Sequence, residues 1–182
     1  MVFCRKGVIL IKGVILMCIR ELIKKNHGES KWEETLQKSS VPMKVLLPVQ
    51  DVSDSDTMKI MKTASSVLRI SMNQFIDAFG QHWSTLFAPK MYRLYFTSSK
   101  SSKEFLTKLD SIHVTMTQRM SGASPPRFTY DWQDDKTLIM SYSSKRGLVD
   151  LAIACIHGVG KYYNEKLIVT KLPGDKIKIV FP

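Results

Sequence analysis

Cysteine is scarce in this chain, and no apolar run is long enough to cross a bilayer. Cys4, Cys18 and Cys155 form no C-x-x-C pair, which argues against a disulfide framework and against a cysteine-rich zinc site. We therefore expect a reducing, cytoplasmic location. The apolar stretch at residues 8–19 is interrupted by Lys12 and is followed by no small-residue cleavage site. Neither a signal peptide nor a membrane span is expected.

Positive charge is in excess, with 27 Lys and Arg against 16 Asp and Glu, a formal net charge of +11. This excess fits an anionic partner or cofactor, and it fits an ordinary solvated surface equally well. Because no block of like charges, no arginine-rich helix and no aromatic stacking platform occurs, a basic nucleic-acid-binding module is the weaker alternative. No nucleophile–base pair or carboxylate dyad stands out, so we expect a protein that is not an enzyme.

Apolar periodicity predicts helices in the first two thirds of the chain, over residues 12–25, from Ser30, over 54–68, from Ser71 to Phe87, and over 105–120. After Pro126 the pattern predicts strands at 127–132, 137–144, 166–172 and 176–181, with a helix at 147–163. The expected fold is therefore α+β: an N-terminal helical subdomain (about 11–70), then a subdomain (about 71–182) that contains the helix at 105–120 and a four-stranded antiparallel sheet with an inserted helix. Residues 1–10, whose last five residues are repeated at residues 12–16, are expected to form an extension.

Two local features carry chemistry. His113 lies on the apolar face of its predicted helix, where it is either a core histidine bonded to a backbone carbonyl or a metal ligand. Tyr142, Ser144 and Arg146 are spaced two apart, so in a strand they would project to one side. Two hydroxyls and a guanidinium suit the binding of carboxylates, although an ordinary polar strand face has the same pattern.

Taken together, these features resemble the haem nitric oxide/oxygen binding (H-NOX) family, which includes bacterial gas sensors and the haem domain of soluble guanylate cyclase. The resemblance covers about residues 11–181. The matching segments, in order, are Lys12-Gly13-Val14-Ile15, Trp32-Glu33, Ala78-Phe79-Gly80-Gln81-His82-Trp83, Ile112-His113, Pro125-Pro126-Arg127-Phe128, Tyr142-x-Ser144-x-Arg146 and Ile156-His157-Gly158.

The resemblance implies one haem b, held between the helical subdomain and the sheet subdomain. His113 would be the proximal iron ligand, and Tyr142, Ser144 and Arg146 would bind the propionates. Pro126 would press on the haem from the proximal side, and Ile15 would add similar pressure from the N-terminal subdomain. The other histidines and cysteines are not expected to form a second metal site.

On the distal side, the resemblance implies a pocket lined by the following residues: Ile15, Ile19, Trp83, Phe87, Leu151 and Cys155. Oxygen-binding members carry a tyrosine at the position of Leu151. Leucine offers no hydrogen-bond donor, so nitric oxide, together with carbon monoxide, is the expected ligand rather than oxygen. Because the indole N–H of Trp83 is a possible donor, oxygen binding stays open as an alternative, and haem storage is a further one. Cys155 is expected to serve in packing.

The expected mechanism is a ligand-driven switch. Nitric oxide would bind ferrous haem and weaken the trans bond to His113, and the strain imposed by Pro126 and Ile15 would then relax. The N-terminal helices would shift, and a partner would respond to that shift. By resemblance, the partner is a histidine kinase or a cyclic-di-nucleotide signalling enzyme.

Overall fold

The computed structural model describes residues 10–42, 46–119 and 121–182, and these form two compact units. Unit 1 consists of the described residues of 1–75 and 120–124, and unit 2 of residues 76–119 and 125–182. Of the expected extension at 1–10, residues 1–9 lie outside the described residues, and Leu10 is the first residue of strand β1 (Leu10–Lys12).

Unit 1 is built from helices α1 (Gly13–His27), α2 (Glu29–Ser39) and α3 (Asp54–Leu68), with β1 paired antiparallel to β2 (Asp51–Ser53). Helix α1 buries Leu16, Ile19 and Ile23 completely, which is the spacing of one helical face. Helix α3 has the predicted bounds. It starts after Ser53, whose Oγ accepts a hydrogen bond from the Asp56 N–H at 3.0 Å.

The start of α2 differs from the expectation that Ser30 caps it. Gly28 ends α1, two residues later than the predicted bound of 25 for the last helical residue, with a positive φ of +89° that glycine tolerates, and its N–H donates to the Lys24 carbonyl. The same glycine is the N-cap of α2, so Ser30 lies inside the helix and caps nothing. The prediction from Ser30 was wrong because one positive-φ glycine both ends one helix and begins the next.

Lys12 joins three segments of unit 1. Its Nζ lies 2.6 Å from Asp51 Oδ1 on the paired strand and also donates to the carbonyl of Ser121. The segment 121–124 therefore belongs with unit 1, although the residues on both sides of it belong to unit 2.

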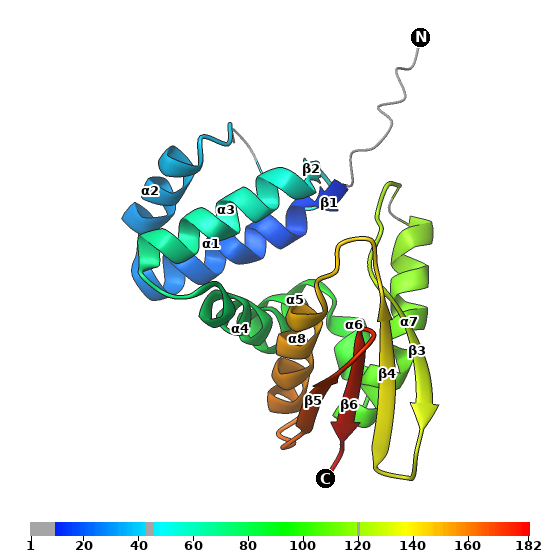
Figure 1. Ribbon diagram of the computed structural model, residues 1–182. Helices are drawn as coiled ribbons and strands as arrows, with labels where there is room; N and C mark the ends of the chain where they lie inside the picture. Colours follow the sequence, from blue (N-terminus) through cyan, green and yellow to red (C-terminus); the bar gives the residue numbers. More distant parts are fainter. Residues whose placement is uncertain (1–9, 43–45, 120) are drawn as a thin grey trace. The chain divides into compact units, whose positions relative to one another are not determined.

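Unit 2 contains the four-stranded antiparallel sheet, in the order β3-β4-β6-β5. Its strands are β3 (Arg127–Trp132), β4 (Thr137–Ser143), β5 (Ile168–Leu172) and β6 (Lys176–Val180). Leu138 and Met140 on β4, with Ile177 and Ile179 on β6, are fully buried at alternate positions. Helix α7 (Ser102–Arg119) packs along β3 and helix α8 (Val149–Tyr162) along β5 (Figure 1). The predicted α+β fold is confirmed.

The segment predicted as one helix from Ser71 to Phe87 changes from α-helical to π-helical hydrogen bonding within its length. Helix α4 (Met72–His82) is followed by a π-helical turn, η1 (Trp83–Phe87), and by the short helices α5 (Ala88–Met91) and α6 (Arg93–Thr97). The predicted cap is present, because Ser71 Oγ accepts from the Gln74 N–H at 3.2 Å. A π-helical turn inserts an extra residue into a helix, and such turns are common at functional sites.

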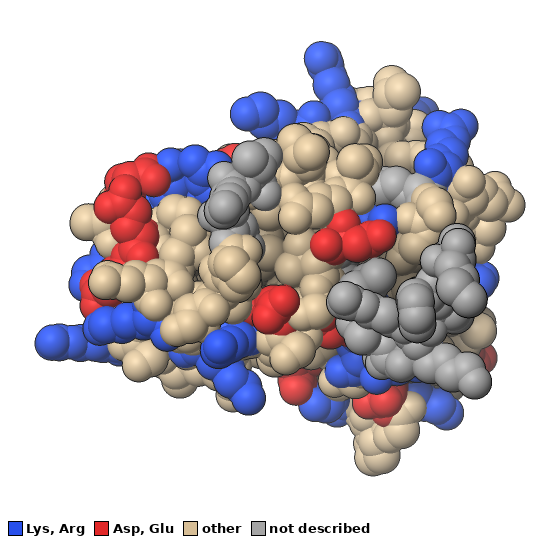
Figure 2. Space-filling model, turned by 90° about the horizontal axis from the view of Figure 1, so that it is seen from above, with Lys and Arg blue, Asp and Glu red and all other residues tan. Residues whose placement is uncertain are grey.

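Helix α8 and the α4–η1 segment cross closely in unit 2. The glycines Gly80 and Gly158 form the crossing, and Ser84 Oγ donates to the Cys155 carbonyl at 2.9 Å. None of the described helices is both long and apolar enough to cross a membrane. In Figure 2, basic and acidic side chains are interspersed over the visible face, which agrees with the scattered charge of the sequence.

Candidate functional site

His113 is held by a backbone carbonyl on the strand side of its helix. Its Nδ1 lies 2.8 Å from the Pro126 oxygen. A carbonyl can only accept, so Nδ1 carries the hydrogen and the lone pair is left on Nε2. Burial lowers the pKa of His113, which favours the neutral ring that can bind a metal. The arrangement fits both alternatives left open by the sequence, a satisfied core histidine and a metal ligand.

Asp110, one helical turn before His113, bonds the first residues of strand β3. Arg127 donates to its two carboxylate oxygens through Nε at 2.7 Å and Nη2 at 2.8 Å, and the Phe128 N–H donates to Oδ1 at 2.8 Å. The Asp110 N–H donates in turn to the Tyr130 hydroxyl at 3.0 Å. The Arg127 guanidinium holds the pKa of Asp110 below its usual range. Sequence reasoning missed these contacts, since only the helical spacing of Asp110 from His113 could have pointed to them.

Phe128 connects His113 with Tyr142. Its ring centroid is 5.7 Å from that of His113 and 5.9 Å from that of Tyr142, and it faces Tyr142 across the β3–β4 register. The predicted ligand and the first residue of the predicted carboxylate-binding motif therefore lie near each other within unit 2.

Tyr142 lies near the end of strand β4, and Ser144 and Arg146 lie in the turn that follows it. Strand β4 ends at Ser143, so strand alternation, on which the prediction rested, does not extend to Ser144 and Arg146. The Tyr142 hydroxyl accepts from the Leu148 N–H at 3.2 Å, and Ser144 Oγ accepts from the Arg146 N–H at 3.2 Å. Gly147 takes a φ of +62°, which is why α8 begins at Val149 and not at Gly147. Each hydroxyl still has its own hydrogen to donate to an anion.

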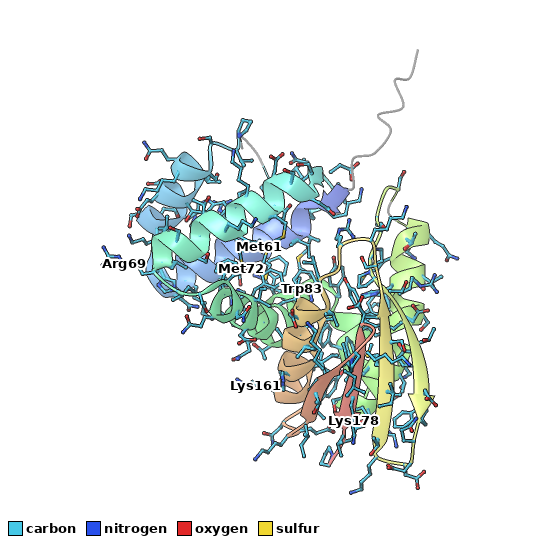
Figure 3. The ribbon with its side chains drawn as sticks, in the orientation of Figure 1. Met61, Arg69, Met72, Trp83, Lys161 and Lys178 are labelled. Carbon is cyan, nitrogen blue, oxygen red and sulfur yellow. The ribbon has the colours of Figure 1, made fainter. Side chains whose placement is uncertain are left out.

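Trp83 and Phe87 lie on η1 in an aromatic stack. The ring centroid of Trp83 is 5.9 Å from that of Phe79 and 5.6 Å from that of Phe87, with interplanar angles of 17° and 25°. Figure 3 shows Trp83 beside helix α8. Tyr92, which the sequence reasoning did not single out, lies with its centroid 6.3 Å from that of Trp83, and burial raises its pKa. Its hydroxyl therefore remains a donor at neutral pH.

Leu151 and Cys155 lie one turn apart on α8, on one face of the helix. Burial raises the pKa of the Cys155 thiol to about 12, so the thiolate needed for metal binding is disfavoured and packing is the role that fits. Ile15 is half-buried on α1 in unit 1, and its predicted pressure on the haem stays a prediction. Of the other histidines, His82 is buried, and His27 and His157 are exposed.

The family model for haem-NO-binding domains (HNOB) matches residues 12–171. Among curated proteins, the soluble guanylate cyclase gcy-32 of Caenorhabditis elegans is 28% identical over 154 residues, which cover 82% of this chain and 22% of that protein. The guanylate cyclase gcy-35 of the same organism is 23% identical over 172 residues, or 90% of this chain and 25% of that protein. The chain thus spans about a fifth to a quarter of the length of these relatives.

Two solved structures show the same fold. An H-NOX protein from S. oneidensis in the Fe(II)NO ligation state superposes with a TM-score of 0.84 at 17% identity, covering 94% of this chain and 98% of that one. An oxygen-binding H-NOX domain in its oxygen complex superposes with a TM-score of 0.80 at 23% identity, covering 94% and 95%. With the family model matched over most of its length, the chain belongs to the haem-NO-binding, or H-NOX, family of haem-binding gas-sensor domains.

Proposed function

We propose that this chain senses a diatomic gas through a haem b that His113 would hold by its iron. The observation that carries the proposal is the hydrogen bond from Nδ1 to the Pro126 carbonyl, which leaves Nε2 as the only ring nitrogen with a lone pair. Histidine ligands of metals usually donate their other N–H in this way, which fixes the ring and raises the basicity of the ligand. The residues present therefore fit a haem. When bound, its iron supplies the coordination position at which a gas is detected.

Tyr142, Ser144 and Arg146 bind the haem propionates in this proposal. Tyr142 and Ser144 accept backbone N–H groups within one turn, which fixes their hydroxyls, and each can still donate to a carboxylate. Arg146 adds a positive charge and the planar donor pair that carboxylates favour. The Phe128 contacts support this assignment, because they connect the turn to the His113 ring.

Nitric oxide, with carbon monoxide, is the proposed ligand rather than oxygen. Donors in the distal pocket decide whether oxygen is held, whereas nitric oxide binds ferrous haem tightly without one. Leu151 has no donor. Cys155, one turn further along α8, offers only a weak S–H donor.

Oxygen binding is the second candidate, and one observation favours it. The indole of Trp83 and the phenol of Tyr92 lie against each other, so two side chains with donor groups meet in unit 2. Exposure of the ferrous protein to air separates the two candidates. A stable oxygen-complex spectrum would reject the nitric oxide-selective proposal, and rapid oxidation without such a spectrum would reject oxygen binding.

The path of the chain near His113 supports a signalling role. Helix α7 and the Pro125–Pro126 corner belong to unit 2, while the segment 121–124 between them belongs to unit 1, where Lys12 bonds the Ser121 carbonyl. A change in the position of His113 or Pro126 would thus reach unit 1 through this short connection. We propose that a separate protein, such as a histidine kinase or a cyclic-di-nucleotide enzyme, responds to that change, and that the domain itself is not catalytic.

The test is the absorption spectrum of His113→Gly with and without imidazole. We expect the variant to lose the haem Soret band of the wild type and to regain it when imidazole replaces the missing ligand. His157→Gly, which removes an exposed histidine from α8, is the control and should keep the wild-type spectrum. A His113→Gly variant with normal haem binding in the absence of imidazole would overturn the assignment.

A further inference from the structure

The Pro126 carbonyl that His113 bonds lies one residue away from the ion pair between Arg127 and Asp110. The carbonyl of Pro126 and the N–H of Arg127 share one planar peptide unit, so a shift of the Arg127 backbone also moves the acceptor of the His113 hydrogen bond. Arg127 is held through its side chain by both oxygens of Asp110. The next backbone N–H, that of Phe128, bonds the same carboxylate.

These contacts close a ring. Asp110 lies three residues before His113, so both side chains lie on the same side of α7. From Asp110 the ring runs through Arg127 to the Pro126 carbonyl and returns to α7 at His113 Nδ1. Tyr130 adds a further bond from β3 to the Asp110 N–H. The carboxylate and the imidazole thus bind two adjoining points of one short backbone segment.

The pair is placed where its stabilising effect is small. The Arg127 side chain is 58% exposed and the Asp110 side chain 20%, and an ion pair with one partner in solvent contributes only modestly to the free energy of unfolding. Its geometry is nevertheless bidentate, the arrangement that defines orientation most sharply. The Asp110–Arg127 pair has a well-defined geometry and lies one peptide away from the Pro126 carbonyl, which accepts the His113 hydrogen bond. A positioning role therefore fits this pair better than a stabilising one.

We propose that Asp110 and Arg127 are positioning residues for His113: by holding the Pro126 peptide, they set the strength of the His113 Nδ1–H hydrogen bond and thereby how strongly the imidazole would bind the haem iron. This inference rests on the proposed function, since it needs His113 as the ligand. A strong bond to the carbonyl makes the imidazole a better electron donor, and an acceptor that is free to drift makes it a poorer one. The same anchoring holds the ring of Pro126 in place.

The experiment compares Asp110→Ala, Asp110→Asn, Arg127→Ala and Arg127→Lys in the haem-loaded ferrous protein. The iron–histidine stretching band in resonance Raman spectra should shift to lower frequency, most in Asp110→Ala and less in Arg127→Ala, which keeps the Asp110–Phe128 bond. Arg127→Lys, which keeps the charge, should lie nearer the wild type. Transfer of haem to apomyoglobin should be about ten-fold faster in Asp110→Ala.

Lys108→Ala is the matched control, because it removes the Glu104–Lys108 ion pair, another exposed pair on α7, at 2.6 Å, which does not touch β3. It should leave the band in place. If Asp110→Ala and Arg127→Ala lower the melting temperature but leave the band and the haem transfer rate as in the control, the pair is only structural and the inference is wrong. If the wild type itself has no iron–histidine band, the failure lies in the proposed function instead.

Discussion

The close crossing of Gly80 and Gly158 gives the sharpest prediction about stability. A Cβ added at Gly80 would lie 2.4 Å from the Ala154 carbonyl carbon, 2.5 Å from the Ala154 Cβ and 2.7 Å from the Cys155 nitrogen. Carbon atoms normally pack at about 3.5–4.0 Å, so the α4–η1 segment and α8 would have to separate by roughly 1 Å. Two of the three neighbouring atoms belong to the backbone, which cannot rotate away.

Overpacking of this kind costs about 1–3 kcal/mol, and the rigid backbone neighbours place Gly80→Ala near the upper end. Alanine recovers about 1 kcal/mol through its higher helix propensity. The free energy of unfolding should therefore fall by about 2 kcal/mol, which for a chain of this length lowers the melting temperature by roughly 4–8 °C. Thermal and urea denaturation followed by circular dichroism measure this, with Asp77→Ala, an exposed position on α4, as the control.

The double variant tests the mechanism. A Cβ at Gly158 would lie 2.7 Å from the Gly80 carbonyl oxygen and 2.7 Å from the Ser84 Cβ, so the same separation of the helices relieves both clashes. Gly80→Ala with Gly158→Ala should thus lose less stability than the sum of the two single variants, by about 1 kcal/mol or more. Additive losses, or a Gly80→Ala variant as stable as the wild type, would refute the reasoning.

Three further predictions concern the site and its supporting contacts. Arg127 lowers the pKa of Asp110 in the folded state, so the contribution of this carboxylate is present above its ordinary pKa of 3.8 and is lost as the pH falls through the lower, folded value. In urea titrations, the stability difference between wild type and Asp110→Asn should therefore shrink only below the ordinary pKa of 3.8, and a difference that stays constant there would contradict the reasoning. Leu151→Tyr supplies a hydroxyl donor, so the ferrous form of this variant should hold oxygen in air for longer than the wild type does. Leu151→Phe lacks the hydroxyl and should behave as the wild type; equal spectra for the two variants would count against the proposal that the lack of a donor at Leu151 disfavours oxygen. Glu165 accepts hydrogen bonds from the N–H and hydroxyl of Ser102 at the start of α7, so Glu165→Ala should lower the free energy of unfolding, measured by thermal denaturation, by about 1–2 kcal/mol. Glu33→Ala, at an exposed site, should leave it almost unchanged, and equal effects of the two substitutions would show that the bonds from Ser102 to Glu165 are unimportant.

The sequence by itself determined the elements and the fold class. Helical periodicity placed α3 at its observed bounds, and the strand pattern after Pro126 placed β3 at its observed bounds. The apolar spacing around His113, the Pro125–Pro126 corner and the Tyr-x-Ser-x-Arg motif were sufficient to predict the family, which the match over residues 12–171 confirms. These signals are local, because propensity and periodicity act between residues only a few positions apart.

Tertiary structure decided which groups meet. Asp110 and Arg127 are 17 residues apart in the chain, so their ion pair exists only because α7 packs along β3. The π-helical turn η1 could not be predicted from the sequence either, since no local residue distinguishes it from the α-helix before it. Ser144 and Arg146 were singled out for a strand that ends before them, and they lie instead in the turn after β4, where Ser144 Oγ accepts a hydrogen bond from the Arg146 N–H. Hydrogen bonds and close contacts between elements depend on how those elements pack, and local sequence patterns do not determine that packing.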